Sequence, residues 1–248
     1  MLSRRAFVAG AAALLCRPRP ARAEGRAAKD HVLRLDLPIL TEDPAAVPVI
    51  VWAEHPMEAD HYVRSIRVAL PTDPVPEKGR YGFTPLAGRA WVSLQMRSGA
   101  GGLVQAEAED TRHGRFVATG EVRVAEGGCG VGPDRVRKDT AGNPVVRLPR
   151  AYRAGDIIEV RARIDHASHT GLAFKNGKYV REAPEYYLTQ MLATFDGRPV
   201  CDFRLTSAVS ANPLIRFTVK VPGPGTLRVL WKNSDGQSWE AAQPLKPA

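Results

Sequence analysis

Short segments in which apolar and polar residues alternate occur along most of the chain. The clearest are residues 62–70, 120–125, 156–164 and 215–221. A period of two is typical of strands in antiparallel sheets that have one buried face and one solvent-exposed face. The positions expected to point inward are Ile66, Val68, Leu70, Val122, Val124, Ile158, Val160, Ala162, Ile164, Ile215, Phe217, Val219 and Val221.

Turn signals separate these segments at short intervals. Asn176-Gly177, Asp196-Gly197, residues 222–225 and residues 234–236 carry the Asn, Asp, Gly and Pro residues that tight turns require. No long stretch with a period of 3.6 residues follows the first 23 residues. Many short strands with frequent turns and no helices predict an all-β protein built from β-sandwiches.

The chain divides into two blocks of strands. Residues 31–125 contain about six predicted strands and residues 145–242 about seven, and about 100 residues is the usual size of one immunoglobulin-like sandwich. A glycine-rich, polar stretch separates the blocks. We therefore predict two immunoglobulin-like domains, residues 30–132 and 145–248, joined by a linker at 133–144. The alternative is one large sandwich with a long loop, although such loops are uncommon inside compact domains.

The first 23 residues have the pattern of an export signal. A charged start precedes about eight small apolar residues, too few to span a bilayer, and the segment ends at an A-x-A cleavage pattern, residues 21–23. Arg4-Arg5 fits the twin-arginine type. An ordinary secretion signal and a lipoprotein anchored at Cys16 are the alternatives. We expect a periplasmic protein with no membrane anchor.

Removal of this signal changes the charge of the chain. The formal net charge is +9, and residues 1–23 contain five arginines and no acid, so the mature chain carries +4. No run of basic residues with interleaved aromatics remains, so we expect no nucleic-acid partner. A mild positive charge favours small anions.

Cys129 is the strongest candidate for chemistry. Its neighbours Gly127, Gly128, Gly130 and Gly132 predict a flexible arm that leaves the thiol unshielded. An ordinary thiol is a few per cent thiolate at neutral pH, and the thiolate is the nucleophile. A mobile tether suits attachment and presentation of a substrate better than catalysis. The alternatives are a loop cysteine without a function and one half of a disulfide.

Cys201 lies in a predicted strand, residues 198–205. We expect Cys201, Phe203 and Leu205 on an apolar face, and Val200, Asp202 and Arg204 on the other face. This pattern indicates a buried structural thiol. A disulfide with Cys129 is the alternative.

No other motif indicates catalysis or a cofactor. The chain has six histidines, among them His55, His61, His166 and His169, but none has zinc-finger spacing, and we expect no metal site. Nucleotide-binding and serine-hydrolase motifs are absent from the sequence. We therefore expect a protein without cofactors that is not itself an enzyme.

Several motifs resemble those of a known pair of domains. Gly-Gly-Cys-Gly at 127–130, preceded by residues 121–125, resembles the carboxyl terminus of SoxY, the sulfur-carrying subunit of the bacterial thiosulfate-oxidising system. Segments similar to the SoxY body are Val47-Pro-Val-Ile-Val, His55-Pro-Met, Asp60-His-Tyr-Val and Phe83-Thr-Pro-Leu. Segments similar to its partner SoxZ are Gly155-Asp-Ile-Ile-Glu-Val, Gly171-Leu, Ala211-Asn-Pro-Leu and Phe217-Thr-Val-Lys-Val-Pro-Gly-Pro-Gly-Thr-Leu. Together they cover residues 31–245.

The resemblance is to fused SoxYZ-like carriers associated with quinoprotein dehydrogenases. It implies immunoglobulin-like domains, an S–S adduct of a sulfur compound on Cys129, and partners that are periplasmic oxidoreductases, either cytochrome c-type or quinoprotein dehydrogenases. The arm of SoxY normally ends its chain, whereas here it continues into a second domain. The alternative function is a non-covalent accessory module of a periplasmic quinoprotein dehydrogenase.

Overall fold

The computed structural model describes residues 31–125, called here the first half, and residues 141–248, called the second half. The first half contains a 3-10 turn η1 (Pro85–Ala87) and the strands β1 (Val32–Asp36), β2 (Leu40–Thr41), β3 (Val47–Glu54), β4 (Met57–Glu58), β5 (His61–Ala69), β6 (Glu77–Phe83), β7 (Trp91–Met96), β8 (Gly102–Asp110) and β9 (Arg115–Val124). The second half contains β10 (Gly142–Arg147), β11 (Ile157–Asp165), β12 (Leu172–Lys175), β13 (Lys178–Arg181), β14 (Leu188–Phe195), β15 (Arg198–Leu205), β16 (Leu214–Lys220), β17 (Gly225–Asn233) and β18 (Ser238–Leu245).

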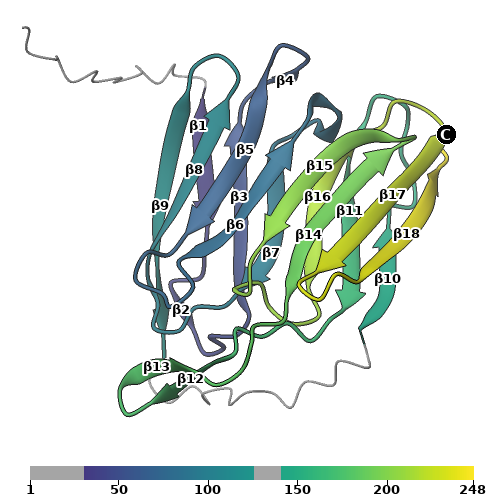
Figure 1. The fold of residues 1–248 in the computed structure, drawn as a ribbon. Coiled ribbons are helices and arrows are strands. Elements are labelled where there is room, and N and C mark those ends of the chain that lie inside the picture. Colours follow the sequence, from purple (N-terminus) through teal and green to yellow (C-terminus); the bar gives the residue numbers. More distant parts are fainter. Residues whose placement is uncertain (1–30, 126–140) are drawn as a thin grey trace, which may run out of the picture.

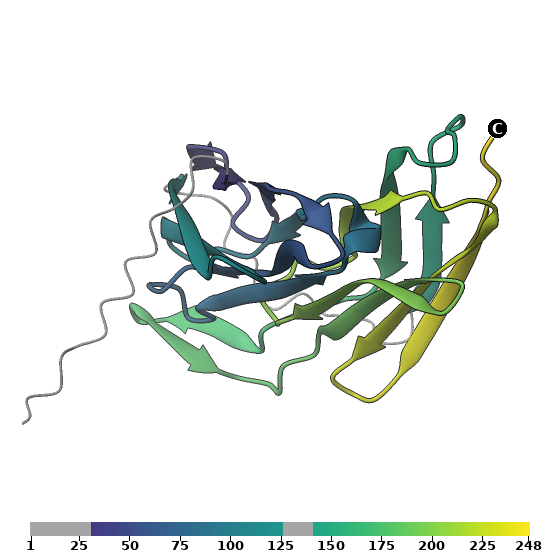
Figure 2. The same ribbon diagram turned by 90° about the horizontal axis from the view of Figure 1, so that it is seen from above.

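All of these strands except β12 and β13 form two layers that face each other (Figures 1 and 2). One sheet has six strands in the order β1-β3-β7-β16-β11-β10, and the other has ten, in the order β18-β17-β14-β15-β6-β5-β8-β9-β2 with β4 paired to β5. The described residues contain no α-helix, so none of them forms a helix that could cross a membrane. The predicted all-β class with two immunoglobulin-like sandwiches is confirmed.

The two halves are joined edge to edge. In the larger sheet β6 pairs with β15, with Tyr81 opposite Phe203, and in the smaller sheet β7 pairs with β16, with Val92 opposite Phe217. Both sheets therefore run through both halves, and the buried apolar residues of the two halves form one continuous core. Pairing between these four strands satisfies backbone N–H and C=O groups that would otherwise lie unpaired on exposed sheet edges.

The inward positions follow the predicted alternation closely. All of those in β5, β11 and β16 are buried, as is Val122 in β9, whereas Val124 is only partly buried. Val200 was expected on the polar face, but it is fully buried beside Cys201. A shift of register between β14 and β15 at Ala193 causes this difference, because the extra residue of a bulge turns two successive side chains toward the core.

Two predicted hairpin turns are also present. Asn176 and Gly177 join β12 to β13 with φ values of 50° and 77°, and Asp196 and Gly197 join β14 to β15 with 45° and 79°. Two successive left-handed residues are what a two-residue hairpin turn of this kind needs. The β12–β13 hairpin is a separate two-stranded sheet, and Figure 1 shows it below the lower ends of β2 and β9.

Candidate functional site

The predicted arm, with Cys129 and Gly127, Gly128, Gly130 and Gly132, lies outside the described residues. The structure describes the chain up to Ala125, after β9, and again from Ala141, before β10. Cys129 is four residues after Ala125 in the sequence. Ala125, called here the anchor, is the described residue nearest to Cys129 along the chain.

The end of β9 is held firmly by the short strand β2. The two strands pair in parallel, and the backbone N–H groups of Arg123 and Ala125 donate to the carbonyls of Ile39 and Thr41, each at 2.9 Å. Gly101 lies against the backbone of Val122 with a φ of 73°, where a Cβ would collide with the Val122 carbonyl. The segment that follows Ala125 thus starts from a fixed point on the sheet.

A cleft of about 380 Å³ is formed by residues of both halves. Pro44 and Ala45, which closely follow β2, form one wall, and the β12–β13 hairpin of the second half forms another. Lys175 of the hairpin pairs with Glu182. The lining of the cleft is largely apolar, and it contains the residues Pro44, Ala45, Asp73, Pro74, Val75, Arg97, Gly99, Thr170, Leu172, Ala173, Phe174, Lys175, Tyr179 and Glu182.

A buried ion pair fixes the first-half side of the cleft. The Lys78 Nζ is 2.7 Å from the Asp73 carboxylate and donates to the Arg97 carbonyl at 2.9 Å. The second oxygen of Asp73 accepts from the Gly99 N–H at 2.7 Å. Burial lowers the pKa of Lys78, and the pairing with Asp73 opposes this effect. The cleft therefore combines a rigid floor with a wall contributed by the hairpin of the other half.

Cys201 is buried, with 1% of its surface exposed, and its thiol is free. Burial raises the pKa of this thiol far above its ordinary value, so it stays protonated at neutral pH. The expectation of a buried structural thiol is confirmed. Cys201 is consequently a poor nucleophile.

The ring of His166, in the second half, is held in place by contacts with buried neighbours. Its ring stacks on Tyr186 with centroids 4.4 Å apart, and its Nδ1 lies 2.9 Å from the Ser168 hydroxyl. Its Nε2 lies 3.4 Å from the side-chain nitrogen of Asn233. Burial lowers the pKa of His166 to about 4. The ring is therefore neutral at neutral pH and belongs to the core.

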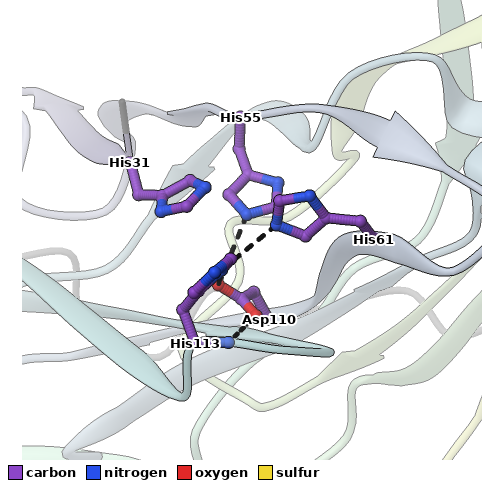
Figure 3. Close-up of side chains that lie close together, drawn as sticks. All are labelled: His31, His55, His61, Asp110 and His113. Carbon is purple, nitrogen blue, oxygen red and sulfur yellow. Dashed lines mark hydrogen bonds and ion pairs between the residues drawn. The ribbon is translucent and has the colours of Figure 1, made fainter. Parts of the chain in front are cut away.

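Four other histidines gather at one end of the first half (Figure 3). His31 precedes β1, His55 follows β3, His61 opens β5, and Asp110 ends β8, three residues before His113 in the next turn. Sequence reasoning missed this group, because its members are spread over more than 80 residues and only the fold brings them together. The Asp110-x-x-His113 spacing was the one local signal.

Asp110 is the buried centre of this cluster. Its side chain and that of His55 are fully buried, and they lie 3.3 Å apart. Burial by itself would raise the pKa of Asp110, but hydrogen bonds from the backbone N–H groups of His113 and Arg112 and the nearby His55 outweigh it and lower the pKa. Asp110 is therefore a carboxylate.

Three solved structures to which the chain is similar are distant from it in sequence. A putative superoxide reductase from Thermotoga maritima is 23% identical over 40% of this chain and 89% of its own, with a TM-score of 0.34. A superoxide reductase (neelaredoxin) from Ignicoccus hospitalis is 18% identical over 44% and 82%, with a TM-score of 0.31. A β-glucuronidase of glycoside hydrolase family 2 is 12% identical over 88% and 20%, with a TM-score of 0.26. Likeness at this level says nothing of function. No curated protein matches the chain.

Family models give a clear result. The model of sulfur oxidation protein SoxY matches residues 21–129, and the model of sulphur oxidation protein SoxZ matches residues 146–244. These matches cover the two halves of the fold, and the first of them ends at residue 129. The families are carrier proteins of sulfur oxidation that work with sulfur compounds and with sulfur-oxidising enzymes. The chain belongs to the SoxYZ family and carries the SoxY and SoxZ domains fused in one polypeptide.

Proposed function

We propose that this protein is a periplasmic carrier that holds a sulfur compound covalently on Cys129 and presents it to partner enzymes. The observation that carries the proposal is that the SoxY match extends to residue 129, which supports Cys129 as the counterpart of the carrier cysteine of that family. The burial of Cys201 also supports this choice, because only a thiol that readily forms a thiolate can react.

The attachment is an oxidation. A bond between the Cys129 sulfur and a thiol-level sulfur of the cargo forms with release of two protons and two electrons. A partner oxidoreductase, cytochrome c-type or a quinoprotein dehydrogenase, accepts the electrons. The carrier supplies the thiol and its position, and the partner supplies the redox chemistry, so the carrier needs no catalytic residues of its own.

The described frame supports presentation of a tethered thiol. Ala125, four residues before Cys129 in the sequence, is held on the sheet by its pairing with β2. Fusion of the two domains replaces the affinity between separate subunits with a high effective concentration. Export through the Arg4-Arg5 signal, in a folded state, is part of the proposal.

A pair of cysteine variants tests this function in cells. Cys129→Ser is expected to accumulate as a folded, exported protein that no longer supports oxidation of the sulfur compound, while Cys201→Ala, the matched control, keeps that activity. A Cys129→Ser protein that still binds and supports a periplasmic dehydrogenase would instead identify a non-covalent accessory module.

A further inference from the structure

We propose that His31, His55, His61, Asp110 and His113 form a binding site for one divalent transition-metal ion. The five side chains come from four segments at one end of the first half and point toward a common centre (Figure 3). One ligand atom from each lies within 4.8 Å of all the others. The cluster plays no part in the proposed carrier function.

The spacing of the ligand atoms matches a coordination shell. With metal–ligand distances of about 2.1 Å, adjacent ligands are about 3.0–3.4 Å apart and opposite ligands about 4.2 Å apart. His61 Nε2 lies 3.2 Å from His113 Nδ1. The Asp110 Oδ2 lies 3.3 Å from His55 Nε2 and 3.4 Å from His113 Nδ1. These separations leave room for one ion at the centre after small adjustments.

Outer contacts already orient two of the ligands. His55 Nδ1 is 2.6 Å from the Pro56 carbonyl, an acceptor that requires the proton on Nδ1 and so leaves the lone pair of Nε2 facing the cluster. The Asp110 Oδ1 accepts from the backbone N–H of His113 at 2.6 Å, which leaves Oδ2 for the metal. Contacts of this kind are common behind metal ligands, where they fix the tautomer and the ring orientation.

Hydrogen bonds alone do not account for the cluster. The His31 ring lies 4.4 Å from the ring of His55 and 4.6 Å from that of His113, between centroids. Its buried Nδ1 has no hydrogen-bond partner among residues 31–125 and 141–248. A buried nitrogen without a partner is costly. A metal ion bound at this nitrogen would remove that cost.

The set of donors selects the class of metal. Imidazole nitrogen suits zinc, iron, cobalt, nickel and copper, whereas calcium and magnesium prefer shells made of oxygen. His55 and Asp110 are fully buried, but 45% of the His113 side chain is exposed, so an ion has a path from solvent. The site thus fits a borderline transition metal close to the surface.

The site is remote from the anchor of the arm. The ten residues of β9 separate the turn that contains His113 from Ala125, a span of roughly 30 Å at about 3.4 Å per residue. A bound ion would connect the start of β1 to the ends of β3 and β8 and to the start of β5. It would therefore stabilise the first half without contact with Cys129.

Metal titration of the untagged mature protein tests the proposal. After removal of metal with EDTA, Zn²⁺ is titrated by calorimetry, and Co²⁺ is followed by its visible absorption. We expect one ion per chain, a melting temperature higher by about 5–10 °C at 100-fold excess over Kd, and no comparable effect of Ca²⁺. Cys129→Ser is expected to bind as tightly as the unchanged protein, which separates this site from the thiol.

Three variants of the cluster and one control variant decide the assignment. His61→Gln and His113→Gln are each expected to weaken Zn²⁺ binding at least tenfold, and the double variant to abolish it, while His169→Gln in the second half leaves it unchanged. Circular dichroism confirms that each variant is folded, and His113 is the safest position because it lies in an exposed turn. The proposal is overturned if no 1:1 binding occurs, or if binding survives the double variant or is lost equally in His169→Gln.

Discussion

Phe203→Ala tests whether the two halves form one cooperative unit. Phe203 is fully buried in β15 at the junction. Its ring makes edge-to-face contacts with Tyr81 and Phe83 of the first half, at 5.3 Å and 5.5 Å between centroids, and with Phe217 of the second half at 6.2 Å. Truncation of a fully buried Phe costs about 3–5 kcal/mol, and three aromatic contacts place this one at the upper end, about 4–5 kcal/mol.

Urea unfolding measures the effect from both sides of the junction. Trp52 and Trp91 report on the first half, and Trp231 and Trp239 on the second, so two reporter proteins, each with one pair replaced by Phe, follow the halves separately. We expect Phe203→Ala to lower the midpoint equally in both, with one transition and an unchanged slope. Phe174→Ala, at a position 64% exposed, is the control and should change stability by less than about 0.5 kcal/mol. A shift confined to the second-half reporter would refute the continuous core.

Three other predictions concern single sites. Lys78→Met leaves the buried Asp73 carboxylate without its cation and should destabilise the protein by about 3–5 kcal/mol in urea, with partial recovery in Lys78→Met/Asp73→Asn; no recovery would contradict the pairing. Gly101→Ala should lower the free energy of unfolding clearly more than its control Gly236→Ala, because both glycines have φ values near 75° but only Gly101 lies against another backbone segment. Equal losses of about 1–2 kcal/mol in both variants would show that a Cβ fits beside Val122 and would contradict this reasoning. The pKa of His166 is lowered to about 4 in the folded protein, so the unfolded chain takes up the proton first, and stability should fall by at most about 3 kcal/mol as the pH drops from 6.5 to 4. His166→Gln should remove this dependence, and an unaltered pH profile of the unfolding free energy would contradict it.

Alternation and turn chemistry made most of the strands predictable. The inward faces of β11 and β16 and the turns at Asn176-Gly177 and Asp196-Gly197 depend on neighbouring residues only, so a sequence displays them directly. The short strands β2 and β4, of two residues each, have no period to detect. Val200 departed from the pattern because a bulge is a property of the pairing between two strands.

Features that depend on distant segments could not be predicted in this way. The pairing of β6 with β15 and of β7 with β16 joins edges whose partners no local pattern specifies. The histidine cluster combines His31 with Asp110 and His113, about 80 residues later, and its existence follows from where β1, β8 and β9 meet. The proposed carrier cysteine, in contrast, can be identified from the sequence alone, because its glycine-rich context and the SoxY match both point to Cys129.

The most direct test of the carrier function is the intact mass of the protein, purified from its native organism without reductant and measured again after reduction. The proposal predicts an excess mass that maps to Cys129, disappears on reduction and is absent from Cys129→Ala, and its size identifies the cargo. An adduct that persists in Cys129→Ala, or a loss of two hydrogens that marks a disulfide between Cys129 and Cys201, would contradict it.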